Sequence, residues 1–181
     1  MNSSGGYGKA WGVLEMKLSI QNIESKQLNG WLRSAEFAVG GFMWVGFSKR
    51  QPNRLLCISS QYISLVDCDT GEIVECDADY DEENFVAISE SLPDEVVDIY
   101  GQYGGSPIWQ TVFGEEILIY IQKEEFAGKT VIRTKVTFQT LDENIILHNN
   151  YGFYTCSFSP CGNYLVFADD GGVTIFRRAI S

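Results

Sequence analysis

Short runs of apolar and β-branched residues, each followed by a turn signal, recur along most of this chain. The separating turns are rich in Asp, Gly and Pro, which reverse a strand at low conformational cost, as at 69–72, 127–129, 160–162 and 169–172. Runs of this length and composition are typical of β-strands. They predict strands at residues 11–20, 42–47, 55–59, 62–67, 117–122, 130–138, 154–158, 164–167 and 173–176.

Alternation within the run 130–138 supports a strand there. In an extended chain, successive side chains point to opposite faces of the sheet. From residue 132 onward one face receives Ile132, Thr134, Val136 and Phe138, and the other receives Arg133, Lys135 and Thr137.

Helical patterns are sparse in this sequence. In the segment 81–91 acidic residues come first, and Phe85, Ile88 and Leu92 recur at helical spacing before Pro93. A short helix is predicted there. The segment 20–28 is a weaker candidate, which could equally continue the first strand into a turn, so we expect at most one or two short helices.

The C-terminal run Phe158-Ser159-Pro160-Cys161-Gly162-Asn163-Tyr164-Leu165, followed by Asp170-Gly171-Gly172-Val173-Thr174-Ile175, resembles the inner strands of a WD-repeat propeller blade. A second run, 53–72, is similar to propeller hairpins that end in D-x-x-T-G-E. Blades of about 40 to 45 residues would number four at most in this chain, and neither a Trp-Asp nor a Gly-His dipeptide is present. We therefore expect no closed WD propeller.

These patterns together predict an all-β, mainly antiparallel fold, in which propeller-blade-like hairpins assemble into a curved sheet or a two-sheet sandwich. A length of 181 residues fits one domain. We expect a flexible Ser/Gly-rich segment at 1–10 and a single β domain at 11–181. No signal-peptide pattern and no apolar run of roughly 20 residues is present, so a cytoplasmic protein without membrane association is expected.

Charge is distributed very unevenly along the chain. Residues 55–122 contain fifteen Asp and Glu but no Lys or Arg, whereas the remainder holds all thirteen Lys and Arg with nine carboxylates. The net charge of −11 is therefore a regional property. Because a segregated negative field attracts cationic surfaces and repels nucleic acid, we expect a basic protein partner and no nucleic acid.

Signatures of catalysis and metal binding are weak. Five cysteines without paired spacing, beside a single histidine, argue for free thiols and against structural zinc. His148 lies in a turn-like stretch, where we expect a surface or capping residue, and a pairing with Cys156 or Ser159 is the remaining catalytic alternative. No enzyme activity, cofactor or metal site is therefore expected.

Residues 77–88 begin like a calcium-binding loop but depart from it at two defining positions. Glu82 stands where the loop requires glycine, and Ile88 stands where it requires a bidentate glutamate. A solvated acidic loop is the better interpretation, and weak binding of a divalent cation stays open.

Two neighbouring segments supply candidate binding residues, an acidic cluster at 77–83 and a glycine-rich loop with aromatic residues at 99–109. The loop lacks the lysine or helix N-terminus of a phosphate site, so it is either a structural turn or a recognition loop. Tyr and Trp are common anchors of protein interfaces. The candidate partner-binding residues are Asp77, Asp79, Tyr80, Asp81, Glu82, Glu83, Tyr103 and Trp109.

A small acidic β domain of this kind resembles the immunity proteins of bacterial polymorphic-toxin and contact-dependent inhibition systems. The resemblance lies in general character across the chain and not in a diagnostic motif. It implies a cytoplasmic inhibitor that neutralises a cognate toxin domain, often a nuclease, by covering its active site or substrate-docking face. The alternatives are a propeller-like scaffold module, which binds through strand edges and loop rims, and an enzyme that uses the carboxylates with a divalent metal.

Overall fold

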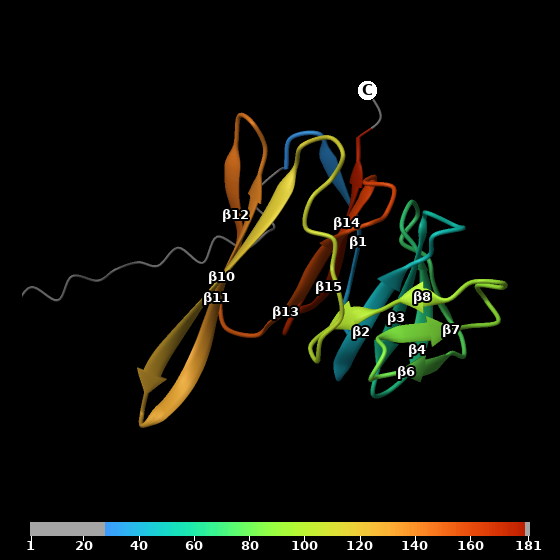
Figure 1. Cartoon of the computed structure of the whole chain (residues 1–181), viewed down its shortest axis with the longest axis horizontal. Helices are drawn as coiled ribbons and strands as arrows, with labels where there is room; N and C mark the ends of the chain where they lie inside the picture. Colours follow the sequence, from blue (N-terminus) through green and yellow to red (C-terminus); the bar gives the residue numbers. More distant parts are fainter. Residues whose placement is uncertain (1–27, 180–181) are drawn as a thin grey trace, which may run out of the picture.

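The computed structural model describes residues 28–179, which form fifteen β-strands and no helix. Every strand pairing in this region is antiparallel, and the strands are arranged in four small sheets, none of them closed into a barrel (Figure 1). The prediction of an all-β, mainly antiparallel sandwich of hairpins is confirmed.

Two sheets contribute most of the buried strands. The first has the order β1-β15-β14-β13 and comprises β1 (Trp31–Phe37), β13 (Phe153–Phe158), β14 (Tyr164–Asp169) and β15 (Gly172–Arg178). The second has the order β5-β4-β3-β2-β9 and comprises β2 (Phe42–Phe47), β3 (Arg54–Ser59), β4 (Ile63–Asp67), β5 (Ile73–Glu75) and β9 (Tyr100–Gly101).

The other two sheets have three strands each. One comprises β6 (Asp79–Asp81), β7 (Val86–Ile88) and β8 (Val97–Asp98). The other comprises β10 (Glu116–Phe126), β11 (Lys129–Gln139) and β12 (Asn144–Asn150). In both, strands that follow one another in the chain are neighbours in the sheet.

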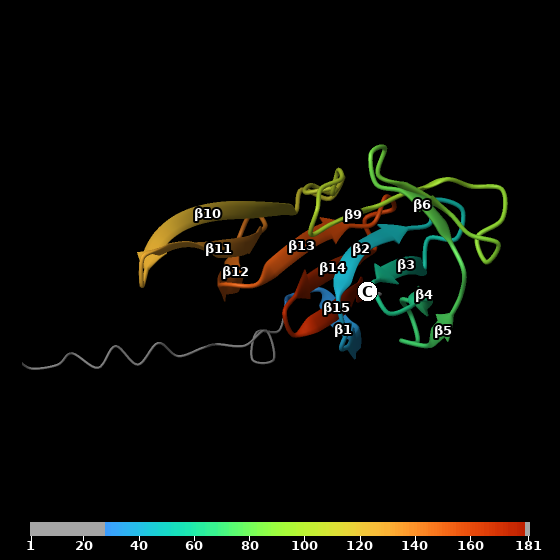
Figure 2. The same ribbon diagram turned by 90° about the horizontal axis from the view of Figure 1, so that it is seen from below.

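The four sheets stack as layers, because each of three apolar clusters contains residues from two successive sheets (Figures 1 and 2). The sheet β10–β12 packs against one face of β1-β15-β14-β13 through Val136, Phe138, Leu165 and Phe167. The other face of β1-β15-β14-β13 packs against the sheet of β2–β5 and β9, whose outer face is covered in turn by β6–β8.

Stacking on both faces explains the continuous apolar runs in the sequence. Along β14, Leu165 enters the cluster shared with β10–β12, whereas Val166 enters the cluster shared with β2–β4. Along β3, Leu55 and Leu56 divide in the same way between two clusters. Strands in the two central layers therefore need apolar residues at successive positions, which accounts for their sequences better than alternation does.

Most predicted strands are present, and β10 and β11 are longer than predicted because their hairpin extends past the last residue paired with β12. Beyond Thr134 the two strands continue as a projecting ribbon that we call the arm, residues 122–133 (Figure 1). The exposed Ile132 lies there. The predicted segment 1–10, the predicted strand 11–20 and all but the last residue of the helix candidate 20–28 fall outside the described residues.

The predicted helix at 81–91 is wrong. This segment forms the end of β6, a turn and β7. The carboxylate of Asp81 accepts hydrogen bonds from the backbone N–H groups of Glu83 and Asn84, at 2.9 and 3.0 Å, and Phe85 adopts a left-handed φ of 53°. An Asp that bonds to the backbone two and three residues ahead favours a turn over a helix, so the helical spacing of the apolar residues was misleading.

Candidate functional site

The acidic residues predicted to bind a partner lie together on the outermost sheet. Asp79, Tyr80 and Asp81 form β6, Asp77 precedes this strand, and Glu82 and Glu83 are in the turn to β7. All six are exposed. A strand that is buried on both faces could not hold so many charged side chains. The outermost sheet can, because one of its faces is exposed to water.

Nine carboxylates between residues 72 and 94 form no ion pair with any described residue. We call this set the free acidic cluster. All of its members are exposed: Glu72, Glu75, Asp77, Asp79, Asp81, Glu82, Glu83, Glu90 and Asp94. Within residues 28–179, the charge predicted from composition is therefore available to a partner at this end of the molecule.

Carboxylates on either side of the free acidic cluster are neutralised by cations from elsewhere in the chain. Asp67 lies 3.2 Å from Arg54, and Asp98 lies 2.6 Å from Lys49. Burial alone would raise the pKa of Asp67, but bonds from the backbone of Thr70 and Asp69, with the Arg54 charge, lower it below its usual value. Because Asp67 and Asp98 are paired with cations of the chain itself, we exclude them from the candidate binding residues. The carboxylates that remain are those of the free acidic cluster.

Asp81 differs from the other acids of β6 and its turn. Its second carboxylate oxygen accepts a hydrogen bond from the side chain of Asn84 at 2.7 Å, and this bond, with those from the backbone, lowers the pKa of Asp81. The side chains of Asp79, Glu82 and Glu83 have no hydrogen-bond partner among the described residues. Asp81 therefore shapes the turn, whereas these three acids are free to contact a partner.

Two of the predicted aromatic residues come together over a buried tryptophan. Trp44 of β2 is only 1% exposed, and its ring centroid lies 5.4 Å from that of Tyr80 and 5.7 Å from that of Tyr103. Tyr80 comes from β6 and Tyr103 from the loop after β9. The rings join the free acidic cluster to the central sheet and leave both tyrosines partly exposed.

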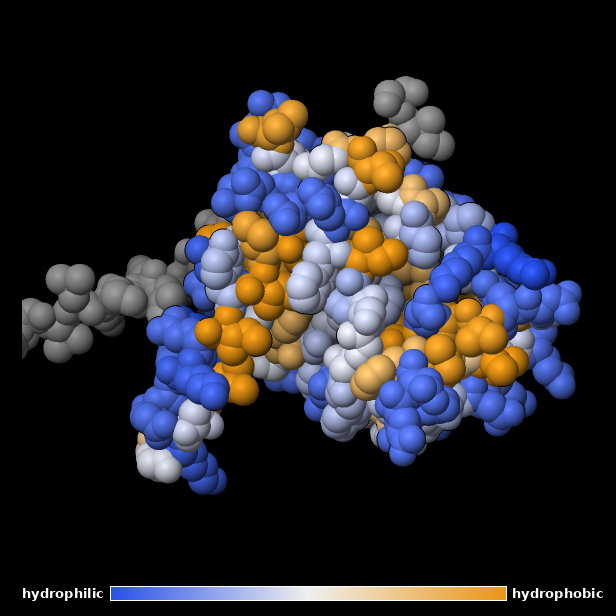
Figure 3. Space-filling view, viewed as in Figure 1, coloured by the Kyte–Doolittle hydropathy of each residue, from blue (hydrophilic) through white to orange (hydrophobic). Residues whose placement is uncertain are grey.

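Apolar side chains lie within the same end of the molecule. Ile88, the last residue of β7, and Val96, the residue before β8, are 58% and 49% exposed. Figure 3 shows an apolar patch over these strands with hydrophilic side chains around it. An apolar centre with a charged border is the usual composition of a protein interface, and sequence reasoning missed these two residues because isolated exposed Ile and Val carry no signal.

Trp109 lies apart from the tyrosine pair. Its carbonyl accepts a hydrogen bond from the N–H of Ile117 in β10 at 2.7 Å, and the preceding residue, Ile108, bridges to Phe158 in β13. The loop 99–109 thus contributes Tyr103 to one end of the molecule and Trp109 to the seam between β10 and β13. Of the eight predicted residues, Trp109 is the one that is not part of the candidate surface.

Tyr154 and Asp170 extend the candidate surface beyond the predicted residues. The Tyr154 hydroxyl donates to Asp170 Oδ1 at 2.7 Å, and its ring stacks on Phe42 with centroids 5.3 Å apart. The hydrogen bond to Asp170 raises the pKa of Tyr154, with smaller contributions from burial, from the charges of Asp170 and Asp169, and from Tyr103. The sequence showed this aspartate only as part of a turn, so no signal marked the pair.

The prediction that His148 lies in a surface turn is wrong. It belongs to β12, opposite Val136, and its ring packs on Phe153 and Phe167 with centroids 5.8 and 5.6 Å away. Its Nδ1 lies 3.6 Å from Asp169 Oδ2. The apolar run before this histidine, Ile145 to Leu147, has only three residues and is followed by Asn149 and Asn150, so the sequence gives a weak strand signal; pairing with β11 stabilises the strand.

The described residues provide no nucleophile for His148. Cys156 is fully buried, which raises the pKa of its thiol, and the hydroxyl of Ser159 accepts the N–H of Tyr164 at 3.0 Å beside Cys161. No hydrogen bond joins His148 to either residue. Within residues 28–179, no group of three or more His, Cys, Asp or Glu is placed to hold a metal ion.

All five cysteines are free, and three of them are buried in the core. Burial raises the pKa of the Cys57 thiol to about 12 and raises that of Cys68 further above its usual value. Thiols held protonated in this way are poor nucleophiles. The three buried cysteines, Cys57, Cys68 and Cys156, therefore act as small apolar side chains of the core.

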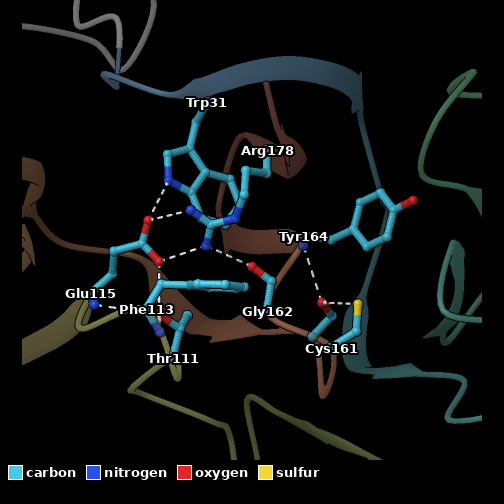
Figure 4. Close-up of polar contacts among 9 residues, drawn as sticks. Trp31, Thr111, Phe113, Glu115, Cys161, Gly162, Tyr164 and Arg178 are labelled. Carbon is cyan, nitrogen blue, oxygen red and sulfur yellow. Dashed lines mark hydrogen bonds and ion pairs between the residues drawn. The ribbon is translucent and has the colours of Figure 1, made fainter. Parts of the chain in front are cut away.

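The densest polar network is a buried ion pair between Glu115, in the loop before β10, and Arg178, at the end of β15 (Figure 4). The two groups form a bidentate pair at 2.7 and 2.6 Å. Glu115 also accepts bonds from Thr111 Oγ1 at 2.7 Å and Trp31 Nε1 at 3.2 Å. Arg178 lies between the rings of Trp31 and Phe113, 4.5 and 4.3 Å from their centroids.

This network has the properties of a structural clamp. Burial alone would raise the pKa of Glu115, but the hydrogen bonds from Arg178 and Thr111 and the Arg178 charge lower it below its ordinary value of 4.5. Every oxygen of the carboxylate is occupied by the chain itself. The pair therefore joins the loop 111–115 to β1 and β15 and leaves no free group for chemistry.

No protein-family model, curated protein or solved structure matches this chain. In the described part of the chain, no helix has the length and apolar character required to cross a membrane.

Proposed function

We propose that this protein is a binding protein that inhibits a basic protein partner through the free acidic cluster and the adjacent Tyr80 and Tyr103. The observation that supports this best is the set of nine exposed carboxylates without a cation from the described chain. Accumulating so much like charge costs folding stability, so its retention favours a role in binding.

The partner class that suits this surface best is a cognate toxin domain, such as a nuclease, whose phosphate-binding face is cationic. Clustered negative charge accelerates encounter with such a face and occupies positions meant for phosphates. The tyrosines over Trp44, with Ile88 and Val96, supply the uncharged contact area that charges alone lack. On this proposal the protein is a cytoplasmic immunity protein without enzymatic activity of its own.

The decisive experiment is co-expression with the toxic domain encoded by the neighbouring gene, followed by measurement of binding and of cell survival. In the variant D79K/E82K two free carboxylates become cations, whereas Asp81 is kept because it shapes the turn. We expect the association rate at low salt to fall by about tenfold or more, because steering by charge is lost. Survival of cells that express the toxic domain should fall in parallel.

The matched control is D142K/E116K, which changes the net charge equally at the opposite end of the stack. Neither side chain forms an ion pair with a described residue. If D79K/E82K and the control bind the partner equally well, and binding is indifferent to salt, the acidic surface is not the interface.

A scaffold module is the second candidate. It is favoured by the stack of small antiparallel sheets and by the long β10, whose outer edge is bridged in the described chain only near Gln110 and Trp109. An unpaired edge of this length can accept a strand from another protein. Binding of a peptide that survives D79K/E82K but is abolished by a proline at Ile121 would favour this candidate over an inhibitor.

A further inference from the structure

Within residues 28–179, an arginine lies against aromatic rings and pairs with a carboxylate in two places. The first is the buried network at the end of β15 (Figure 4). Arg178 lies between the rings of Trp31 and Phe113, 4.5 and 4.3 Å from their centroids, while its guanidinium forms the bidentate pair with Glu115.

The second place repeats this arrangement with one ring. Arg133 lies 5.4 Å from the ring centroid of Tyr151 and 3.3 Å from the carboxylate of Glu124, to which the Tyr151 hydroxyl also donates at 2.7 Å. A planar guanidinium can stack on an aromatic ring and bond to a carboxylate at the same time. Aromatic rings beside a carboxylate are therefore the surroundings in which this molecule holds an arginine.

Tyr80, Trp44 and Tyr103 form a third aromatic set, which lies beside the free acidic cluster. The Trp44 centroid is 5.4 Å from that of Tyr80 and 5.7 Å from that of Tyr103, so the two tyrosine centroids are at most about 11 Å apart. A cation midway between the tyrosines would lie within about 6 Å of both centroids, which is the range of a cation–π interaction. No Lys or Arg of the described chain lies over either tyrosine ring.

Contacts between the turn after β6 and the loop after β9 hold the two tyrosines in place. The N–H of Ile99 donates to the carbonyl of Phe85 at 2.9 Å. The ring of Phe85 packs so closely on Gly104 that a Cβ at this glycine would lie 2.5 Å from it. The N–H of Gly101 donates to the carbonyl of Gly104 at 2.8 Å and closes the turn that carries Tyr103. A site that is positioned before binding loses less conformational entropy when a ligand enters.

Carboxylates lie beside both tyrosines. Asp79 directly precedes Tyr80 and belongs to the free acidic cluster. The hydrogen bond from Tyr154 to Asp170 raises the pKa of Tyr154, and Tyr103 is close enough to add to this rise, so the exposed Asp170 is a second carboxylate on the Tyr103 side. Negative charge on both sides favours a cation, and a guanidinium suits two rings better than an ammonium, which is more strongly hydrated and does not stack.

We propose that Tyr80, Trp44 and Tyr103 form a binding site for one arginine side chain of a basic protein partner, with the guanidinium between the two tyrosine rings. This inference rests on the proposed function, because it assigns an anchor within the same interface. It goes further by naming the group that is recognised: a partner surface of equal charge that presents only lysines should bind less tightly. Arginine is also among the residues that contribute most to the affinity of protein interfaces.

Two peptides of equal charge, hexa-arginine and hexa-lysine, test this assignment with the full-length protein. Isothermal titration calorimetry at about 0.15 M sodium chloride measures the affinity for each. We expect the wild type to bind hexa-arginine about fivefold more tightly than hexa-lysine. Tyr103→Leu should weaken hexa-arginine binding by about fivefold and hexa-lysine binding by less than about twofold, whereas Tyr103→Phe keeps the ring and should keep both affinities.

Tyr120→Leu is the matched control, because Tyr120 is 54% exposed, close to the 62% of Tyr103, and lies on β10 at the opposite end of the stack. It should leave both affinities unchanged. Tyr80→Leu supplies a second variant of the site, and thermal unfolding of each leucine variant checks that it remains folded. If Tyr80→Leu does not fold, the more exposed Tyr103 carries the test alone.

The inference is overturned if hexa-arginine does not bind at millimolar concentration, if the wild type binds both peptides equally, or if Tyr103→Leu weakens both equally or neither. D79K/E82K separates this inference from the proposed function. Loss of both peptides in D79K/E82K, with no effect of Tyr103→Leu, would support an acidic interface that lacks an arginine site. Binding of both peptides that is unchanged in D79K/E82K would contradict the acidic interface itself.

Discussion

Among individual side chains, Glu115 and Arg178 form a bidentate ion pair that joins the loop before β10 to β15. The guanidinium and carboxylate are mostly enclosed, with side-chain exposures of 25% and 10%, and both carboxylate oxygens and both terminal guanidinium nitrogens form hydrogen bonds. Removing one partner of a buried pair leaves the other charge without compensation, which costs roughly 3 to 5 kcal/mol when both are fully buried. We expect the Glu115–Arg178 pair to contribute more to the free energy of unfolding than any ion pair on the surface of the described residues.

Glu115→Gln should lower the free energy of unfolding by about 2 kcal/mol at pH 7, less than for a full burial because Arg178 keeps some contact with water. The carboxylate has a lowered pKa in the folded state, so its contribution is complete above about pH 4.5 and is lost as pH falls through the folded-state value. Urea unfolding at several pH values should show the difference between wild type and E115Q shrinking only below pH 4.5.

The exposed pair of Arg33 and Glu36 supplies the control, since its side chains are 43% and 53% accessible. Glu36→Gln should change stability by no more than about 0.5 kcal/mol. Equal losses in E36Q and E115Q would show that the Glu115 network is no more than a surface contact.

Cysteine reactivity should follow burial. Alkylation of the native protein with iodoacetamide should modify Cys76 and Cys161 and leave Cys57, Cys68 and Cys156 intact, because burial keeps those three thiols protonated and inaccessible. Peptide mass spectrometry before and after urea unfolding checks this expectation. Rapid labelling of Cys156 in the native protein would contradict the packing of β13.

Individual binding residues could be predicted only in part from the sequence. Tyr80 and Tyr103 could be named because aromatic residues beside an acidic run are typical of interfaces, but Trp44, which brings them together, lies in an apolar run and looks like any core residue. The acids that remain unpaired could not be identified, because Asp67 and Asp98 find their cations at Arg54 and Lys49 only after folding.

Among the strands, β10 shows how burial changes along one strand. Ile117 is 2% exposed in the cluster with Phe138, whereas Ile121, two pleats further along the same face, is 67% exposed. Ile117→Ala should lower the free energy of unfolding by about 3 kcal/mol, and Ile121→Ala should change it by less than about 0.5 kcal/mol. Chemical unfolding of the two variants measures this gradient, and similar losses would place Ile121 in a core.

The contact between β2 and β9 depends on the absence of a side chain at Gly101. A Cβ there would lie 2.8 Å from the Cα of Trp44 and closer still to the carbonyl oxygen of Met43, neither of which can move without breaking the sheet. Gly101→Ala should therefore cost about 2 kcal/mol and weaken the position of Tyr103.

Gly40→Ala is the matched control for Gly101→Ala. Its added Cβ would lie 2.7 Å from Nε2 of Gln61, the end of a flexible side chain that can turn away. Thermal unfolding should show a clearly lower midpoint for G101A than for G40A. The reverse order would mean that β9 adapts its position more easily than the geometry indicates.

Strands in the two central layers could be predicted because burial on both faces demands uninterrupted apolar residues, as in β3 and β14. The short strands β6 and β7 could not, because each has three residues and their pairing depends on the turn set by Asp81. β12 was missed for another reason: its apolar run is only three residues long, two asparagines follow His148, and the strand is completed by its pairing with β11.

For the molecule as a whole, the excess of negative charge should make thermal stability depend on salt concentration. The free acidic cluster is self-repulsive, and added salt reduces the screening length from about 30 Å at 0.01 M to about 10 Å at 0.1 M. The thermal unfolding midpoint of the wild type should therefore rise with sodium chloride over this range. D79K/E82K, with four units less negative charge, should start higher and rise less; identical curves would show that the cluster carries no repulsion.

The pairing of β1 with β15 has a consequence for how the chain folds during its synthesis. Ser34 bonds to Ile175, a residue 141 positions later in the chain, so the ribosome releases β1 long before its partner exists. At roughly 5 to 20 residues per second the delay is about 7 to 28 seconds. Throughout this interval the edge of β1 that pairs with β15 is unprotected, and because unpaired strand edges promote aggregation, the newly made chain is exposed to this hazard until translation reaches the last strand.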